Sequence, residues 1–203
     1  AAVVRAHSQI GGLEMQATKM FDHIVHSGLS KRDSEFVELA RQKAEEVKAL
    51  TEAAIADGTL TLEALFDTDL RSIEGSNPPR FTSKLTSWAE QNWQPFIEAV
   101  KDSNPDEITS VVCSSLKGFL PVQLKELSRA PTGDIAHDTK YCRNGRVIQD
   151  PVDIPAKTSE HDYMMAVFRH EGDGHSYKVM RNVYVPLRIN GRRWGDFEIA
   201  YSI

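Results

Sequence analysis

The sequence predicts an α+β protein, in which long N-terminal helices precede an antiparallel β-sheet with a helical cover. Three observations predict this class. Apolar residues recur every three or four positions over much of residues 3–101, which is the period of a helix packed on one side. β-branched and aromatic residues become frequent after residue 107, and Asn190-Gly191 is a preferred dipeptide of two-residue hairpin turns. We divide the chain into a helical part, residues 1–60, and a sheet-containing part, residues 61–203.

The first predicted helix, residues 3–28, carries apolar or small residues in alternating steps of three and four. This spacing is the a/d pattern of a coiled coil, and Gly28 is placed to end the helix. Two interpretations stay open. The stripe packs on its own domain, or it forms a seam with a partner, for which a second copy of the chain is expected. The pattern consists of Val3, Ala6, Ile10, Leu13, Ala17, Met20 and Ile24.

Three further helices are expected before the sheet. Ser30 is a favourable N-cap for a long second helix, and Thr61 is one for a short third helix. The segment GSNPP at 75–79 predicts a surface loop. A fourth helix, residues 82–101, has Pro95 in its interior, where we expect a kink or a restart. Its predicted apolar face is formed by Leu85, Trp88, Phe96 and Val100.

Four strands are expected in the second half of the chain. The first, residues 108–116, is rich in β-branched residues. Residues 125–160 are rich in loop-forming residues, and three prolines there exclude a long regular element. Three strands follow at 162–171, 176–189 and 193–203. Because they are joined by short turns, they predict an antiparallel meander.

The composition excludes several classes of partner and activity. With a net charge of -5, the chain has no electrostatic reason to bind nucleic acid or an anionic membrane. No apolar run approaches the roughly 18 residues of a membrane span, so no direct membrane insertion is expected. The motifs GxSxG, HExxH and the P-loop are absent, so we expect no enzymatic activity. Cys113 and Cys142 fit no metal or redox spacing; buried thiols are expected, and a disulfide stays open.

The turn between the last two strands leads into the sequence Arg192, Arg193, Trp194, Gly195 and Asp196. One interpretation is structural: Trp194 covers one end of the core and the arginines are solvated. The other is functional: Trp194 and one arginine form a pocket in which a guanidinium binds a carboxylate through two hydrogen bonds. We expect this segment mainly to close the sheet and to contribute to a pocket.

Two other groups of residues are candidates for ligand binding. Arg143, Asn144 and Arg146 cluster hydrogen-bond donors in a loop, where they either bind an anion or are solvated. His170 and His175 flank a loop with acidic residues, which offers nitrogen and oxygen ligands to a metal ion. The spacing matches no established metal motif, and CxxCH is absent. No cofactor is favoured, although haem held by one histidine, or a metal, stays an alternative.

Several segments together show a pattern known from one family. They are AIADGTLTLEALFDTDLRSIEGSNPPRF (54–81), CSSLKGFLP (113–121), YCRNGRVIQD (141–150), VFRHEGDG (167–174) and VYVPLRINGRRWGDFEIAY (183–201). In order and spacing they resemble the C-terminal PAS/Cache-like sensor region of bacterial methyl-accepting chemotaxis proteins. The resemblance extends from about residue 30 onward.

The resemblance implies a PAS-like or Cache-like module, with helices over one face of an antiparallel sheet and a small cavity between them. It implies a noncatalytic sensory domain of a chemotaxis-receptor-like protein, with a small polar or anionic ligand and chemotaxis signalling components as partners. The expected location is the cytoplasm, and a periplasmic domain between transmembrane helices is the alternative. The assigned ligand-binding residues are Arg143, Arg169, Trp194, Arg193, Trp88 and Tyr163.

The sequence also departs from the family pattern within this region. Arg193 stands where the pattern has histidine, and Asp196 stands where it has a second glycine. Because of these departures, one alternative is a degenerate sensor, which has lost its ligand-binding residues and serves only for dimerisation or docking. A haem-binding or metal-binding redox or gas sensor is the third alternative.

Overall fold

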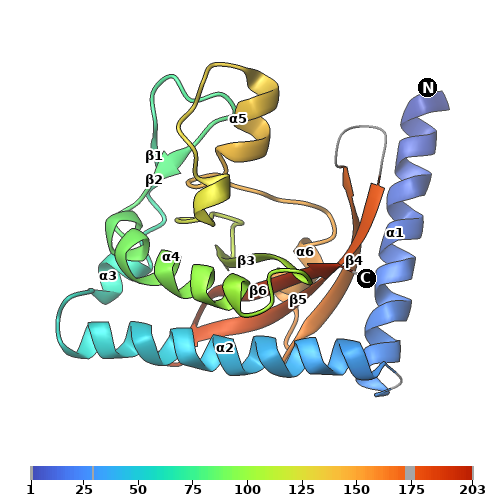
Figure 1. Ribbon diagram of the computed structural model, residues 1–203, viewed down its shortest axis with the longest axis horizontal. Coiled ribbons are helices and arrows are strands. Elements are labelled where there is room, and N and C mark those ends of the chain that lie inside the picture. The colour runs from blue at the N-terminus through green and yellow to red at the C-terminus, as the bar shows by residue number, and fades with distance from the viewer. Residues whose placement is uncertain (1, 29, 172–176, 203) are drawn as a thin grey trace.

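The computed structural model of the chain describes residues 2–28, 30–171 and 177–202. It confirms an α+β fold built around a four-stranded antiparallel sheet (Figure 1). Helix α1 (Ala2–His26) stands at one end of the molecule, and α2 (Lys31–Ala56) runs along its base. Across the described ranges, no helix combines the length and the apolar character that a bilayer crossing requires.

The sheet has the spatial order β3-β6-β5-β4, so that the last strand lies in its interior. All neighbouring strands are antiparallel, as the meander predicted. Asn190 and Gly191 join β5 to β6 with φ angles of 49° and 78°, which confirms the predicted turn with two positive φ angles. The strands are β3 (Ile108–Ser115), β4 (Met164–Glu171), β5 (Tyr177–Ile189) and β6 (Arg192–Ser202).

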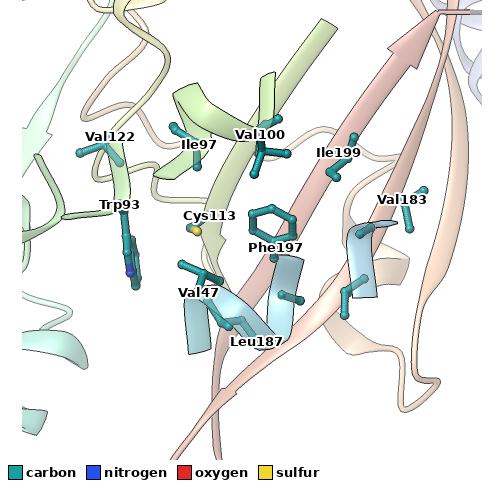
Figure 2. Packing of buried hydrophobic residues seen from close by; sticks show 14 of the residues in the cluster. Val47, Trp93, Ile97, Val100, Cys113, Val122, Val183, Leu187, Phe197 and Ile199 are labelled. Carbon is teal, nitrogen blue, oxygen red and sulfur yellow. The ribbon is translucent and has the colours of Figure 1, made fainter. Parts of the chain in front are cut away.

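One face of the sheet is covered by α2 and α4 (Thr86–Ser103) and forms the main core. Figure 2 shows Phe197 and Ile199 of β6 pointing toward Val47 of α2 and Val100 of α4. Alternate residues of a strand point to opposite faces, so this pattern places Asp196 and Glu198 on the other face. The sheet therefore has one apolar face and one that carries buried charges.

The predicted apolar face of α4 is confirmed in part, because Leu85 and Val100 are buried in the core. Trp93 and Ile97 are fully buried, whereas Trp88 and Phe96 are only partly buried. The helix also continues through Pro95 from Thr86 to Ser103, so the expected restart does not occur. The middle of the face was misassigned because the apolar surface of this helix is broad, and Trp93 and Ile97 lie next to the residues that were predicted.

The first two helices are held to the sheet in different ways. Within α2, Thr51 Oγ1 accepts a hydrogen bond from Trp93 Nε1 at 2.9 Å, which joins α2 to α4 inside the core. In α1, Asp22 Oδ1 accepts the amide hydrogen of Met165 in β4 at 3.0 Å. Thr18 on the same side of α1 is buried. The helix therefore packs on the edge of its own sheet.

The predicted a/d stripe of α1 lies away from this contact. Ile10, Leu13, Met20 and Ile24 are between 39% and 68% exposed. Large apolar side chains with this exposure and spacing leave an interaction surface uncovered. The interpretation that the stripe packs on its own domain is therefore wrong for these four residues. The side chains of Val3 and Ala6 lie outside the described residues.

Short elements connect the helices and strands and cover the ends of the sheet. Thr61 Oγ1 accepts the amide hydrogen of Ala64 at 3.1 Å, which confirms the predicted N-cap of α3. The 125–160 region contains three short helical segments rather than a long element, as its prolines predicted. The remaining elements are α3 (Leu62–Leu65), β1 (Arg71–Ser72), β2 (Phe81–Thr82), η1 (Lys125–Leu127), α5 (Ile135–Tyr141) and α6 (Ile154–Thr158).

Candidate functional site

A cavity of about 160 Å³ lies where the start of β6 meets the end of β3. We call it the tip pocket. Segments that are distant in the sequence form its wall, including the end of α3, the loop that follows it and the residues before α4. A more open depression adjoins it and shares Phe66, Asp67, Thr68 and Arg192 with it. The tip pocket is lined by Leu65, Phe66, Asp67, Thr68, Leu70, Ser83, Leu85, Ser115, Leu116, Lys117, Phe119, Arg192, Arg193 and Trp194.

Trp194 forms a fixed part of this wall. Its indole Nε1 donates a hydrogen bond to the carbonyl oxygen of Leu65 at 2.8 Å. Its ring packs edge-on against Trp93, with the ring centroids 4.8 Å apart. Gly195 permits this arrangement, because a Cβ atom at that position would stand 2.0 Å from the carbonyl oxygen of Ser114. The close approach of β3 and β6 thus places Trp194 at the pocket.

The polar groups of the tip pocket are mostly hydrogen-bond donors. Arg192 and Lys117 have no ion-pair partner within the described ranges, and both are exposed. The guanidinium of Arg192 lies over the ring of Phe66, 3.9 Å from its centroid. Ser115 Oγ accepts the amide hydrogen of Phe119 at 3.0 Å, which leaves its own hydroxyl hydrogen available. Ser83 Oγ similarly accepts a backbone amide hydrogen at 3.2 Å.

One carboxylate, that of Asp67, also lines the pocket. Asp67 Oδ2 accepts the amide hydrogen of Lys84 at 2.9 Å, and its Oδ1 accepts that of Asp69 at 3.0 Å. The hydrogen bond from the Lys84 amide, together with that of Asp69, holds the pKa of Asp67 below its ordinary value. Asp67 therefore keeps its negative charge, but the two cations Arg192 and Lys117 at the same pocket outnumber it, so the net charge of these side chains favours an anion.

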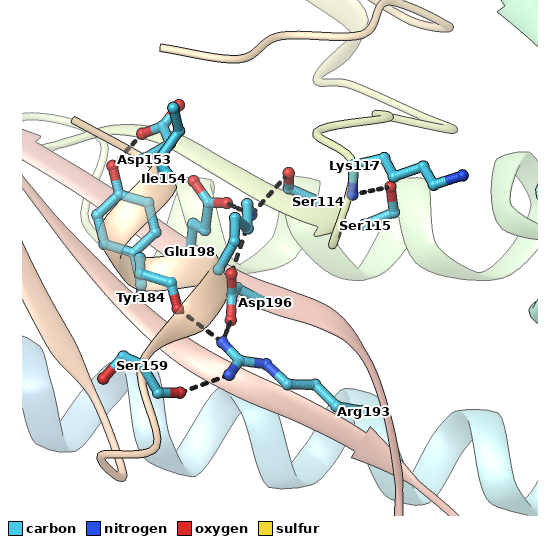
Figure 3. A network of polar contacts seen from close by, with 12 residues as sticks. Ser114, Ser115, Lys117, Asp153, Ile154, Ser159, Tyr184, Arg193, Asp196 and Glu198 are labelled. Atoms are coloured by element: carbon cyan, nitrogen blue, oxygen red, sulfur yellow. Dashed lines mark hydrogen bonds and ion pairs between the residues drawn. The ribbon is translucent and has the colours of Figure 1, made fainter. Parts of the chain in front are cut away.

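Arg193 lines the tip pocket, but its guanidinium is engaged on the other side of the sheet (Figure 3). It donates hydrogen bonds to the carbonyl oxygens of Ser159 and Ala156 at 2.6 and 2.8 Å. It also forms an ion pair with Asp196 at 2.7 Å. These contacts fix the segment around α6 to the sheet and leave Arg192, rather than Arg193, as the arginine exposed at the pocket.

The other predicted ligand-binding residues lie outside the lining of the tip pocket. Trp88 packs edge-on against Trp93, with the ring centroids 5.8 Å apart. Trp93 in turn packs against Trp194, so it links the other two tryptophans. Tyr163 stacks on His26 of α1, with centroids 4.3 Å apart. Trp194 and part of Arg193 thus line the tip pocket, although the Arg193 guanidinium is engaged elsewhere, whereas Trp88 and Tyr163 do not line it. Their predicted role in ligand binding stays a prediction.

Arg143 and Arg169 are also separate from the pocket lining. Arg143 is half-buried, and its Nε has no hydrogen-bond partner within the described part of the chain. Burial lowers the pKa of Arg143, and the charge of Arg146 lowers it further. The backbone of Arg169 belongs to β4, but its side chain, like that of His170, lies outside the described residues, and so does all of His175. The metal hypothesis for the last two stays a prediction.

The second face of the sheet carries a buried network of charges (Figure 3). Lys157 Nζ in α6 lies 2.9 Å from Asp196 Oδ2, Glu198 Oε1 and Ser114 Oγ. Burial lowers the pKa of Lys157, but the charges of Glu198 and Asp196 outweigh it, so the pKa is raised overall. Burial raises the pKa of Glu198 in turn. The network attaches α6 to the sheet through groups that are already paired.

The cysteines and their neighbours offer no activated nucleophile. Cys113 and Cys142 are both free, buried thiols, as expected. Burial raises the pKa of each thiol, and the nearby carboxylates of Glu198 and Asp138 raise them further. His137, Asp138 and Cys142 place potential metal-ligand atoms within 4.8 Å of one another. However, Asp138 Oδ1 and Oδ2 also accept the amide hydrogens of Thr132 and Gly133 at 2.8 and 3.0 Å. These bonds explain the buried carboxylate as a group that holds the preceding loop.

Sequence reasoning identified part of the pocket wall and missed the rest. Trp194 and the neighbouring arginines were identified from the hairpin sequence. Phe66, Lys117 and Phe119 were missed, because they lie in segments that the sequence shows only as a helix end and a turn. Lys157 was missed because nothing local indicates that its side chain reaches the sheet. The sequence indicates the segments that contain these residues, but it does not indicate which other residues their side chains contact.

No protein-family profile matches the sequence, and no curated protein matches it. Among solved structures, the DcuS sensor domain of E. coli is similar with a TM-score of 0.33 and 14% sequence identity. The match covers 56% of this chain and 68% of that chain. The residues of the tip pocket are therefore the basis for assigning a function to this chain.

Proposed function

We propose that the chain is a noncatalytic sensory module that binds a small anionic ligand in the tip pocket. The observation that carries this proposal is the combination of an apolar cavity with unpaired donors at its wall and mouth. Arg192 and Lys117 supply charge, and Ser83 and Ser115 supply hydroxyl groups. A carboxylate is an acceptor-only group, so it matches these donors better than a cation or a second donor would.

The position of the tip pocket suggests how binding would be transmitted. Trp194 contacts Trp93 of α4, and Trp93 donates its indole hydrogen bond to Thr51 of α2. A ligand that stabilises one packing of Trp194 would thereby favour one packing of α2 on the sheet. Only a difference in the ligand's affinity for the two packings can shift their populations. This module would act in a receptor-like signalling protein, with the chemotaxis components implied by the resemblance as partners.

A thermal-shift screen of small metabolites, enriched in carboxylates, tests this function. A ligand present at 100 times its dissociation constant should stabilise the folded state by about 2.7 kcal/mol. Ser83→Phe, which fills the tip pocket, should abolish the shift. Ser87→Phe is the matched control, because Ser87 is exposed on α4 and does not line the pocket. A flat response across the library, or an equal response in both variants, contradicts the proposal.

The exposed stripe on α1 supports a second function, dimerisation with a second copy of the chain. Its alternating steps of three and four are self-complementary, because two such helices can bury their stripes against each other. Leu13→Asp should convert the dimer to a monomer in light scattering coupled to size-exclusion chromatography. Lys19→Asp, exposed on the same helix at a c position away from the stripe, should leave the dimer intact. A wild-type monomer at high protein concentration contradicts this function.

We propose the cytoplasm as the location of the module, with a periplasmic position as the alternative. A haem or metal sensor would be recognised by Soret absorbance or by bound metal in elemental analysis of the purified protein. Arg143 remains a proposed second contact for an anion, because its Nε has no partner among the described residues.

A further inference from the structure

We infer that the ligand of the tip pocket is a carboxylic acid with one six-membered, preferably aromatic, ring. This inference rests on the proposed ligand-binding function and names the chemical class of the ligand. It follows from three properties of the tip pocket: its volume, the character of its interior, and the position of its charged groups.

The volume sets the size of the ligand. The tip pocket measures about 160 Å³. An apolar protein cavity of about 150 Å³ accommodates one benzene molecule. A single ring therefore fills the interior, whereas a short carboxylate such as acetate would leave most of its apolar wall without contacts. Unfilled apolar volume forfeits dispersion contacts, so the smaller anion should bind more weakly.

The interior of the pocket is suited to a flat ring. Leu65, Leu85, Phe119 and Trp194 are buried and line it, and the ring of Phe66 is partly buried beside them. Aromatic rings pack favourably against one another edge-on or offset, beyond the effect of the buried area alone. Trp194 is held in place by Leu65 and Trp93, so the wall is formed before a ligand binds.

The charged groups lie where a ring-bound carboxylate can reach them. Arg192 extends over the ring of Phe66 and belongs to both the tip pocket and the open depression beside it. Lys117 also lines the pocket and is exposed. A ring seated against Trp194 would direct its carboxylate to these two cations at the opening. The hydroxyl hydrogens of Ser83 and Ser115 can bond the same acceptor.

Calorimetric titration with benzoate tests the inference. Benzoate should bind at least about tenfold more tightly than acetate, because the ring buries several additional apolar carbons. Arg192→Gln should weaken benzoate binding about tenfold and leave the binding of the uncharged ring compound benzyl alcohol unchanged. Arg188→Gln is the matched control, because Arg188 is an exposed arginine outside the pocket, paired with Glu160. It should bind benzoate as the wild type does.

A second variant tests the same geometry without removing a native charge. Leu116→Glu places a carboxylate at the wall of the pocket, at a side chain that is 43% exposed. It should abolish benzoate binding by repulsion and retain benzyl alcohol. Equal affinity for acetate and benzoate, or unchanged benzoate affinity in both variants, overturns the ring-acid inference. If a non-aromatic anion then binds in the metabolite screen, the proposed function stands; if no compound binds, both are overturned.

Discussion

Asp33→Asn removes the charge that joins α2 to the two inner strands of the sheet. Asp33 Oδ1 accepts a hydrogen bond from Arg181 Nη1 in β5 at 2.6 Å and another from the Tyr201 hydroxyl in β6 at 2.5 Å. The hydroxyl of Ser30 also bonds this carboxylate. Asp33 is buried, whereas the side chain of Arg181 is 20% exposed. The variant therefore leaves a largely buried guanidinium without its counter-charge.

The expected loss of stability follows from this geometry. Removing one partner of a fully buried ion pair costs roughly 3–5 kcal/mol. Because solvent reaches part of Arg181, and because asparagine keeps one acceptor oxygen, we expect a loss of about 3 kcal/mol, at the lower end of that range. Asp102→Asn is the matched control, since Asp102 is exposed on α4. It should change stability by less than about 0.5 kcal/mol.

The pH dependence provides an independent check. Burial raises the pKa of Asp33, but hydrogen bonds from Ser30, Tyr201 and Arg181 outweigh it, so the pKa lies below its ordinary value of 3.8. A depressed pKa contributes stability that is present above the ordinary aspartate pKa and is lost as pH falls through the folded-state pKa. The difference between wild type and Asp33→Asn, measured by urea denaturation, should therefore shrink as pH falls below about 4. A difference under 1 kcal/mol at pH 7, or one that grows in acid, contradicts this account.

Three further predictions concern the other buried groups. Lys157→Met should destabilise the fold by about 3 kcal/mol in urea denaturation, because it leaves the buried carboxylates of Asp196 and Glu198 without their ammonium partner. Adding Glu198→Gln should restore part of the lost stability. A double variant no more stable than Lys157→Met would contradict this charge network. Cys113 and Cys142 should resist a thiol-specific reagent in the folded state and react in urea, because their raised pKa values keep them protonated; rapid reaction of either native thiol would contradict their burial. Gly195→Ala should lower the thermal midpoint markedly, because its Cβ would meet the Ser114 carbonyl at 2.0 Å; an unchanged midpoint would show that β3 and β6 separate easily.

The elements with strong local signals could be predicted from the sequence. The hairpin at Asn190-Gly191 was predictable because its two positive φ angles favour those residue types. The caps at Ser30 and Thr61 were predictable because their side chains satisfy amide groups only a few residues away. These features depend on interactions within a short stretch of chain, which the sequence displays in full.

The contacts that build the site could not be predicted in the same way. Period-two alternation places Arg193 and Trp194 on opposite faces of β6, but it does not reveal that Ala156 of α6 and Ser159 after it offer carbonyl oxygens to Arg193. Similarly, Phe66 and Trp194 line the same pocket only because the fold brings the end of α3 close to the start of β6. Such long-range contacts depend on how the loops between residues 61 and 160 cross the sheet.

The identity of the tip pocket as the ligand site can be decided by nitrogen–proton correlation spectra recorded during a benzoate titration. Binding there should shift the indole signal of Trp194 and the amide signals of residues 115–119, while the indole signal of Trp88 moves little. Spectra without saturable shifts, or with the largest shifts on the second face of the sheet around Glu198, would contradict the assignment.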